Sequence, residues 1–403
     1  MSGPLEGLKV LDISNVIAGP FAAALLGDFG ADVLKVELPM GSDEKGGDPL
    51  RALPPHKDGK PLLWKAVNRN KRAVTLDLRK PEGQALFLRL LPRFDVLIEN
   101  YRPGTLDRWN LDKEALWKAQ PKLVILRVTG FGQTGPYSGY AGFARLFEAY
   151  SGLAYITRAP GEPPVHPGYP IGDPISGVFG AFGILAALMH RAKHPDAPGQ
   201  EIDLSCTEAM MRLLEVLPIE YDQLGLVHEP VGSGNAYVSP SGMFRAGDGA
   251  WISFTAATQN VFQRLCRTID REDLLADPRY ASNQQRMQHQ PELNAIVAAW
   301  IGARPAREVV RELSEAGVAV APVYSNADIA ADPHFASRES ITRVADADFG
   351  SVAVPCVVPR LSATPGEARS AGPAAGAHNA EIYGGWLGLS EAERAALQRE
   401  GVI

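Results

Sequence analysis

Cysteine is scarce in this chain of 403 residues, which has three, at Cys206, Cys266 and Cys356. Their scattered spacing fits neither a disulfide framework nor the paired ligands of a structural zinc site. Positive charge is not in excess either, because 40 lysines and arginines stand against 46 aspartates and glutamates, a formal net charge of -6. We therefore expect neither nucleic acid nor an anionic membrane surface as a partner.

Long hydrophobic runs and leader-like segments are missing as well. The longest apolar run, residues 178–189, is shorter than the roughly 20 residues that a membrane-spanning helix needs. The first residues, MSGPLEGLKVLDIS, contain no basic segment followed by an apolar one, so no signal peptide is expected. These features predict a cytoplasmic protein.

Several catalytic signatures are also lacking. The chain has no HExxH, no GxSxG and no carboxylate–histidine spacing typical of a metal site, so we expect no metal. Two of the eight histidines, His190 and His194, are four residues apart, but they precede a Pro/Gly turn and are interpreted as partners of a helix carboxyl end. No GxGxxG follows the first expected strand, which argues against a dinucleotide-dependent dehydrogenase.

The first half of the chain alternates short apolar runs with helical patterns, such as those at residues 21–28 and 81–91. This alternation predicts an α/β domain whose parallel, doubly wound sheet is covered on both faces. Sheets of this kind bind ligands at the carboxyl ends of their strands. The expected strands are residues 8–13, 32–37, 73–78, 94–98 and 123–128.

The pattern changes beyond residue 200. Residues 202–223 carry apolar side chains at helical spacing and predict a connecting helix. A hairpin over 243–255, turning at 247–249, predicts the start of a second, smaller α+β domain. The other expected elements are helices at 259–269, 292–301 and 306–315, a strand at 351–358, and a tail helix that starts after Ser390 and ends at Gly401.

One carboxylate, Asp173, stands between a glycine and a proline at the start of the long apolar stretch 170–190. Asp before Pro at a helix start is typical of an N-cap, in which the side chain accepts an unpaired backbone N–H. Alternatively, Asp173 is a nucleophile, kept ionised by the helix N-terminus and approachable because glycines flank it. The spacing does not choose between these interpretations.

Polar residues follow the fourth expected strand in the segment 99–109, ENYRPGTLDRW. An amide, an aromatic ring and two guanidinium groups at one strand end could hold a phosphorylated, adenine-bearing ligand by charge and stacking. A solvated turn is the alternative. The glycine-rich loop 130–136 follows the fifth strand, but it lacks the Lys-Ser/Thr pair of a P-loop.

Several longer motifs, in the same order along the chain, are similar to those of class III CoA-transferases. This is the family of formyl-CoA transferase, carnitine CoA-transferase and α-methylacyl-CoA racemase. The similarity covers nearly the whole chain, and the ordered set is much more specific than any one motif. The motifs are VLDISNVIAGPFAAALLGDFGADVLKVE (10–37), NRNKRAVTLDL (68–78), ENYRPGTLDR (99–108), GFGQTGPYSGYAGF (130–143), GDPISG (172–177), LLADPRYASNQQR (274–286) and HNAEIYGGWLGLS (378–390).

The resemblance implies an enzyme that moves coenzyme A (CoA) from an acyl-CoA donor to a small free carboxylic acid. Asp173 matches the family's catalytic aspartate, which would form an aspartyl anhydride and then an aspartyl-CoA thioester. The family often carries a basic side chain after the second strand, whereas here Leu38 follows Glu37, so no phosphate contact is expected there. The residues that match the family's CoA site are Ile17, Ala18, Leu76, Asn100, Tyr101, Arg102, Arg108, Gly142, Phe143, Ala144 and Arg145.

Two alternatives remain beside the transferase. Racemases that resemble this chain carry a histidine in a Gly-x-Asp segment that stands here as Gly142-Phe143-Ala144. A phenylalanine side chain cannot move protons, so Phe143 and Ala144 disfavour a racemase. The other alternative is a non-catalytic CoA-binding protein, which the intact Asp173 in its glycine-flanked segment disfavours.

The resemblance also implies an architecture. Members of the family are interlocked homodimers, whose large Rossmann-like domain is built from both chain ends. We therefore expect residues 1–200 and 330–403 in a large CoA-binding domain, 201–225 as a linker helix, and 226–329 as the small domain with its return linker. The loop Gly232–Gly242 is a candidate lid that would keep water from the anhydride.

Overall fold

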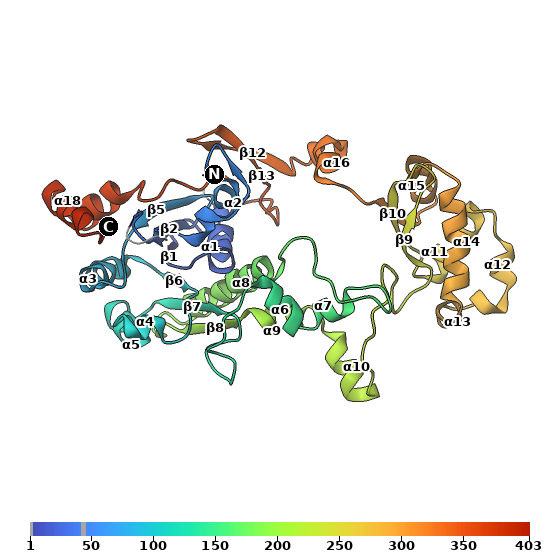
Figure 1. The fold of residues 1–403 in the computed structure, drawn as a ribbon, viewed down its shortest axis with the longest axis horizontal. Helices are drawn as coiled ribbons and strands as arrows, with labels where there is room; N and C mark the ends of the chain where they lie inside the picture. The colour runs from blue at the N-terminus through green and yellow to red at the C-terminus, as the bar shows by residue number, and fades with distance from the viewer. Residues whose placement is uncertain (1–2, 42–45) are drawn as a thin grey trace. The chain divides into compact units, whose positions relative to one another are not determined.

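The computed structural model of the protein describes residues 3–41 and 46–403. Its main sheet has six strands in the order β5-β2-β1-β6-β7-β8, and every neighbouring pair is parallel (Figure 1). The predicted α/β class with a parallel central sheet is confirmed. The strands are β1 (Lys9–Asp12), β2 (Asp32–Glu37), β5 (Lys71–Thr75), β6 (Val96–Glu99), β7 (Val124–Thr129) and β8 (Glu201–Ser205).

The segment after residue 200 differs from its prediction. The expected helix over 202–223 is wrong at its start, because β8 pairs with β7 as the edge strand of the sheet. Ile202 and Leu204 alternate with polar residues, and this period of two suits a half-buried edge strand rather than a helix. The expected linker helix 201–225 is replaced by that strand and two helices, α9 (Cys206–Arg212) and α10 (Val216–Leu224).

Helices cover both faces of this sheet (Figure 1). On one face, α1 (Ala18–Asp28) and α8 (Gly172–Lys193) pack on the sheet through a shared core of aliphatic side chains. The two helices approach closely at Gly177, where a Cβ atom would lie 2.9 Å from the carbonyl oxygen of Ala18. Glycine is required at this crossing, because a side chain there would push α8 away from α1.

The opposite face is covered by α3 (Pro81–Leu90), α5 (Lys113–Ala119) and the end of the chain. Tyr383 is fully buried, and its hydroxyl donates to the carbonyl oxygen of Thr75 at 2.7 Å. The N–H of Asp77 donates to the carbonyl oxygen of Val402 at 2.8 Å. The last residues therefore complete the same hydrophobic core as the first strands.

The C-terminal elements agree with the sequence patterns. β13 (Gly350–Pro355) pairs with β12 (Ile341–Asp346), which confirms a strand close to the predicted one. The tail helix α18 (Glu391–Arg399) is confirmed, and Ser390 caps it through a reciprocal bond with the third helical residue. Between them, η4 (Ala380–Trp386) is a π-helical segment.

By its internal contacts the chain divides into two compact units. Unit 1 contains Met1–Ala154, His166–Leu224 and Ser337–Ile403, and unit 2 contains Tyr155–Val165 and Gly225–Ala336. The six-stranded sheet lies in unit 1. The candidate lid Gly232–Gly242 lies in unit 2, and its role stays a prediction.

Unit 2 is built on the antiparallel sheet β11-β10-β9. The predicted hairpin is confirmed by the antiparallel register of β9 (Ser241–Arg245) and β10 (Trp251–Thr255). The three predicted helices are also confirmed, because their aliphatic and aromatic residues share one core with the sheet. They are α11 (Gln259–Thr268), α14 (Gln290–Gly302) and α15 (Ala306–Glu315).

The remaining elements are short. They are η1 (Pro49–Ala52), β3 (His56–Lys57), β4 (Lys60–Pro61), α2 (Leu62–Val67), η2 (Leu91–Arg93), α4 (Thr105–Arg108), α6 (Ala144–Tyr150), α7 (Leu153–Ile156), α12 (Asp273–Ala276), η3 (Pro278–Tyr280), α13 (Asn283–Gln288), β11 (Ala319–Pro322), α16 (Asn326–Ala331) and α17 (Pro333–Ser337).

The helix α8 is longer than the apolar run that marks it in the sequence. Because it extends over 22 residues, it is long and apolar enough to cross a membrane by length and composition alone, contrary to the expectation. The core helix of a folded protein passes the same test. In the most apolar 18-residue segment of α8, 44% is buried inside unit 1, and Ile184 is fully buried there.

Candidate active site

A pocket opens at the carboxyl ends of β1, β6 and β7 in unit 1. Chain order reverses between β1 and β6, and ligands of open α/β sheets bind at such a switch point. The first turns of α1 and α8 complete the pocket. The residues that line it are Asn15, Val16, Ile17, Ala18, Asn100, Tyr101, Arg102, Pro103, Val128, Thr129, Gly130, Ser138, Tyr140, Ala141, Gly142, Phe143, Phe147, Asp173 and Cys206.

Asp173 lies in the first turn of α8 and is nine-tenths buried. The N-cap interpretation is wrong, because the helix begins at Gly172, and the N-cap residue Ile171 makes no side-chain capping bond. Within the described residues, nothing donates a hydrogen bond to the Asp173 carboxylate. Burial, and then the nearby charge of Glu148, raise the pKa of Asp173 to about 6. At neutral pH this is an ionised carboxylate with unused lone pairs at a pocket wall.

The neighbouring carboxylate, Glu148 on α6, is fully buried and fully bonded. Its Oε1 atom accepts the N–H of Ile171 at 3.0 Å, and its Oε2 atom lies 2.9 Å from Nδ1 of His166. Arg145 donates to the same Oε2 atom at 3.2 Å. Glu148 therefore fastens the first turn of α8 to α6 and sets the position from which Asp173 faces the pocket.

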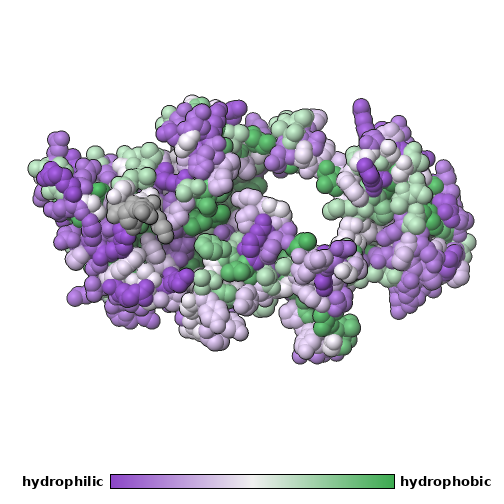
Figure 2. Space-filling model, viewed as in Figure 1, coloured by the Kyte–Doolittle hydropathy of each residue, from purple (hydrophilic) through white to green (hydrophobic). Residues whose placement is uncertain are grey.

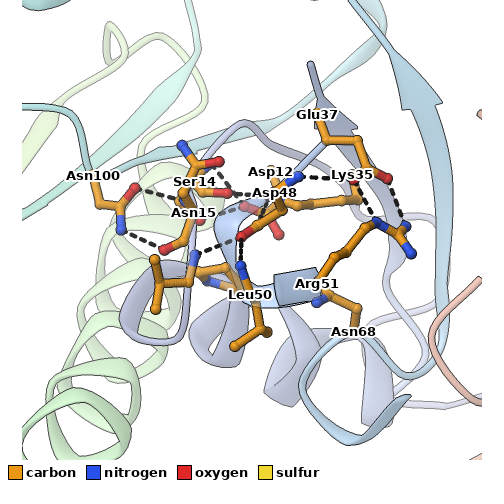
Figure 3. A network of polar contacts seen from close by, with 12 residues as sticks. Asp12, Ser14, Asn15, Lys35, Glu37, Asp48, Leu50, Arg51, Asn68 and Asn100 are labelled. Carbon is orange, nitrogen blue, oxygen red and sulfur yellow. Dashed lines mark hydrogen bonds and ion pairs between the residues drawn. The ribbon is translucent and has the colours of Figure 1, made fainter. Parts of the chain in front are cut away.

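The far wall of the pocket is formed where β1 and β6 end. The side-chain amide of Asn100 donates to the carbonyl oxygen of Asn15 at 2.7 Å and accepts the Asn15 N–H at 2.7 Å (Figure 3). The next residue, Tyr101, stacks edge-on against Trp109 with ring centroids 5.0 Å apart. The segments after the first and fourth predicted strands are thus joined at one place, as their position at parallel strand ends predicts.

The structure brings most of the predicted site residues to this pocket and leaves four outside it. Arg108 is exposed on α4 and donates to the hydroxyl of Thr105 at 2.9 Å. Arg145 bonds Glu148 and the carbonyl oxygen of Pro167. The side chains of Leu76 and Ala144 are buried, the former in the core beneath the sheet. The predicted residues at the pocket are Ile17, Ala18, Asn100, Tyr101, Arg102, Gly142, Phe143 and Asp173.

Other pocket residues were not predicted, although some carried a signal. Thr129 directly follows the predicted strand 123–128, and Asn15 follows the first strand, so both stand at strand ends. Cys206 follows β8, and its place at a strand end is not predicted because the sequence pattern there indicates a helix. Burial raises the pKa of the Cys206 thiol to about 12, so it is protonated at neutral pH.

The side chains of the described residues can be compared with the requirements of a metal site. Over residues 3–41 and 46–403, no group of three or more His, Cys, Asp and Glu side chains is arranged to hold a metal ion. What the pocket offers is an ionised carboxylate, backbone at the start of a helix, and amide, hydroxyl and aromatic side chains. Such a set can bind a ligand with polar and apolar parts and attack an electrophilic carbonyl.

Comparison with known proteins gives the family. The family model described as "CoA-transferase family III" matches residues 5–379. This chain belongs to CoA-transferase family III. The resemblance of its motifs to class III CoA-transferases is thereby confirmed.

Two curated relatives and one solved structure are similar to this CoA-transferase over almost its whole length. A succinyl-CoA–D-citramalate CoA-transferase of Chloroflexus aurantiacus is 42% identical over 401 residues, which cover 99% of this chain and 98% of that protein. The alpha subunit of a succinyl-CoA–L-malate CoA-transferase of Chloroflexus aurantiacus is 40% identical, with 99% and 92% covered. A CAIB/BAIF family protein from Brucella suis has the same fold, with a TM-score of 0.83, 29% identity, and 96% and 100% covered.

The family and these relatives show that the protein is an enzyme, a class III CoA-transferase acting on an acyl-CoA and an acid. In unit 1, the Asp173 carboxylate, which accepts no hydrogen bond from the described residues, lies beside a pocket at a strand switch point.

Proposed function

We propose that the enzyme transfers CoA through covalent intermediates on Asp173. The supporting observation is the carboxylate of Asp173 itself, which is ionised at neutral pH, free of hydrogen bonds within the described residues, and placed at the pocket wall. A carboxylate nucleophile suits CoA transfer, because its anhydride and thioester retain the energy of the substrate thioester.

In the proposed reaction, an Asp173 oxygen attacks the carbonyl carbon of the acyl-CoA, and the carbon–sulfur bond breaks to release CoA thiolate and leave an aspartyl anhydride. The thiolate then attacks the aspartyl carbonyl, so that the donor acid leaves and an aspartyl-CoA thioester remains. The acceptor carboxylate attacks this thioester and again forms an anhydride and thiolate. Attack of the thiolate on the acceptor carbonyl yields the new acyl-CoA and regenerates Asp173.

Each attack places negative charge on a carbonyl oxygen. The start of α1 supplies backbone N–H groups at the pocket, because its N-cap residue Ile17 makes no side-chain capping bond and Ala18 lines the cavity. Unpaired N–H groups and the helix dipole stabilise an anion at such a terminus. We therefore assign oxyanion stabilisation to this helix start rather than to the glycine-rich loop.

The CoA chain would run along the carboxyl edge of the sheet. Tyr101, braced by Trp109, offers a ring for stacking, and Arg102 and Arg108 offer guanidinium groups for phosphate. The predicted contacts of Leu76, Ala144 and Arg145 would be made outside the pocket or through backbone atoms. Direct measurement of CoA binding to Arg102→Ala and Arg108→Ala tests this placement, and unchanged affinity in both contradicts it.

The names of the relatives suggest the substrate class. One acts on succinyl-CoA and D-citramalate and the other on succinyl-CoA and L-malate. We infer that this enzyme takes succinyl-CoA as donor and a short hydroxydicarboxylic acid as acceptor. A mass-spectrometric screen of free acids against succinyl-CoA tests this, with carnitine and oxalate as acceptors that should give no product.

We also propose that the enzyme is an interlocked homodimer, as the family resemblance implies. In unit 1, two large apolar side chains of α8, Phe182 and Met189, are exposed to solvent, with 69% and 59% of their surface accessible. Hydrophobic residues also gather on the surface of α10 (Figure 2), among them Ile219 and Leu224. Apolar surface of this kind marks an interface. Light scattering should give twice the mass of 43.3 kDa, and a monomeric mass contradicts the proposal.

The decisive experiment is chemical trapping. Hydroxylamine added during turnover should convert Asp173 into its hydroxamate, which peptide mapping locates. A mapped modification elsewhere, or none, contradicts the mechanism. In deuterated water, incorporation of deuterium at the α-position of a chiral 2-methylacyl-CoA without CoA exchange would instead support the racemase, whose proton transfer Phe143 cannot perform.

A further inference from the structure

The loop between β1 and α1 is held by side chains rather than by backbone turns (Figure 3). The N–H of Ser14 donates to Asp12 Oδ1 at 3.0 Å, and the N–H of Val16 donates to Asp48 Oδ1 at 3.0 Å. The N–H of Asn15, between them, is the one bonded to the side chain at the end of β6. Three consecutive backbone donors therefore end on three side chains from different parts of the chain.

This loop contains a residue in an unfavourable backbone conformation. Val16 has a φ angle of 65°, in the left-handed region that a β-branched side chain rarely adopts. Such a conformation persists where the surroundings over-determine it, and it often occurs at functional sites. Val16 and its neighbours Asn15 and Ile17 all line the pocket.

An ion pair holds the loop at the strained residue and just before it. Lys35 and Asp48 are both fully buried, with Nζ and Oδ2 3.1 Å apart. Lys35 also donates to the carbonyl oxygen of Ser14, while Asp48 accepts the N–H of Val16. Asp48 in addition accepts the N–H of Leu50 at 2.9 Å and so fixes the start of η1.

The surrounding carboxylates keep Lys35 ionised. Burial alone would lower the pKa of Lys35, but Asp12, Asp48 and Glu37 outweigh burial and raise it. Next to it, Lys71 forms a second buried pair with Asp12 at 2.8 Å. Buried charges are costly when unpaired, so loss of one partner forces the others to move or neutralise.

The pair does not touch the pocket itself. Neither Lys35 nor Asp48 is among the residues that line it, and both act on the loop backbone. We propose that Asp48, paired with Lys35, is a positioning residue that holds Asn15–Ile17 in the conformation that receives the acyl-CoA. This inference rests on the proposed function of the pocket, and it assigns to the ion pair a role in substrate affinity beyond stability.

The test compares Asp48→Ala, Asp48→Asn and wild type, with kinetics normalised to folded protein. Asp48→Ala should lower kcat/KM by about 10- to 100-fold, chiefly by raising KM for acyl-CoA, since small misplacements of binding groups have effects of this size. Asp48→Asn keeps an oxygen for the Val16 N–H and should lie between the two. A folded Asp48→Ala variant with wild-type KM overturns the proposal.

Asp28→Asn is the matched control. Asp28 is equally buried and ion-paired, with its Oδ1 atom 2.9 Å from Nε of Arg69, but it lies at the far end of α1 and does not line the pocket. This variant should lower the unfolding midpoint while leaving KM for acyl-CoA unchanged. If both aspartate variants change KM equally, the effect is general destabilisation and the positioning role is wrong.

A second variant covers the case in which Asp48→Ala does not fold. Glycine adopts a φ angle of 65° without strain, so Val16→Gly should need the ion pair less. Asp48→Asn should therefore raise KM less in the Val16→Gly background than in wild type. Equal factors in the two backgrounds contradict the proposal.

The outcome can be separated from that of the proposed catalytic role. In the Asp48 variants, saturating acyl-CoA should still yield the trapped hydroxamate on Asp173, because the nucleophile is intact. If wild type gives no hydroxamate, the proposed mechanism fails. Calorimetric titration with CoA alone then still decides whether Asp48 controls ligand affinity.

Discussion

Nδ1 of His166 lies 2.9 Å from Oε2 of Glu148, and the other oxygen of Glu148 accepts the N–H of Ile171 at the start of α8. Through this chain of bonds, a buried carboxylate is placed close enough to Asp173 to raise its pKa. The arrangement makes the proposed nucleophile sensitive to pH in a predictable direction. Glu148, which raises the pKa, and Asp173, which would react, are therefore different residues.

The first prediction concerns this pH dependence. Asp173 must be ionised to attack, and its pKa is about 6, so kcat/KM should rise with pH between about 5 and 7. Glu148→Gln removes the neighbouring negative charge and should move the midpoint of this rise to lower pH. The exposed α5 variant Glu114→Gln should leave the midpoint in place. An unshifted midpoint in Glu148→Gln contradicts the assigned coupling.

The second prediction separates activity from stability at Asp173. Its pKa rises from 3.8 in the unfolded chain to about 6 in the fold, so the ionised form destabilises the native state above pH 6 and has no effect below about pH 4. Asp173→Asn should therefore abolish transfer yet raise the free energy of unfolding by on the order of 2 kcal/mol at pH 7.5. Denaturant unfolding at pH 7.5 and 4.5 measures the difference.

The gain in stability should be much smaller at the lower pH, and CoA binding should survive at both. The exposed variant Asp196→Asn, in the turn after α8, serves as control and should change neither activity nor stability. Loss of stability in Asp173→Asn at pH 7.5 would show that its carboxylate has a structural partner.

The third prediction tests the bond between the ends of β1 and β6. Asn100→Ala leaves the N–H and the carbonyl oxygen of Asn15 without their 2.7 Å partners. Asn15 is half-buried at the pocket wall, and loss of both bonds should displace it there, so KM for acyl-CoA should rise about tenfold or more. Asn110→Ala, which removes one exposed side-chain bond to Gln84 at 3.2 Å, should leave KM unchanged.

The fourth prediction concerns the crossing of α1 and α8. A Cβ atom on Gly177 would meet the carbonyl oxygen of Ala18 at 2.9 Å, and backbone at that distance cannot yield without moving a helix. Gly177→Ala should destabilise the protein by about 1–3 kcal/mol and lower kcat, since Asp173 is one turn earlier. Thermal unfolding and steady-state kinetics measure both effects.

Gly183→Ala is the comparison in the same helix. Its Cβ would meet a side-chain carbon of Ile202 at 3.3 Å, and Ile202 sits half-buried on the edge strand, where a side chain can adjust. Alanine also favours helix over glycine by about 1 kcal/mol. This variant should be close to neutral, and equal losses in the two variants would contradict a specific role for the Gly177 crossing.

Much of the fold could be predicted because its cause is local. Runs such as 8–13 and 32–37 are rich in Val, Leu and Ile, which suits strands buried on both faces, although they also contain charged residues that the fold buries, such as Asp12 and Lys35. The hairpin at 247–249 has glycines where the chain turns. The exception is Glu201–Ser205. At the sheet edge this strand is only half-buried, so it has few apolar residues. Together with the apolar residues of the helix that follows, they fit a helical spacing.

The sequence by itself determined the family, the alternation of strands and helices, and which strand ends would carry polar residues, since these depend on residue types and on their order. It left the role of Asp173 open between cap and nucleophile, because both suit the same residues. Tertiary structure excluded the cap by starting α8 at Gly172, and it placed Glu148 beside the carboxylate, while the nucleophilic role of Asp173 stays a proposal. It also decided the pairing of Lys35 with Asp48, because contacts between distant residues depend on where the folded backbone brings them together.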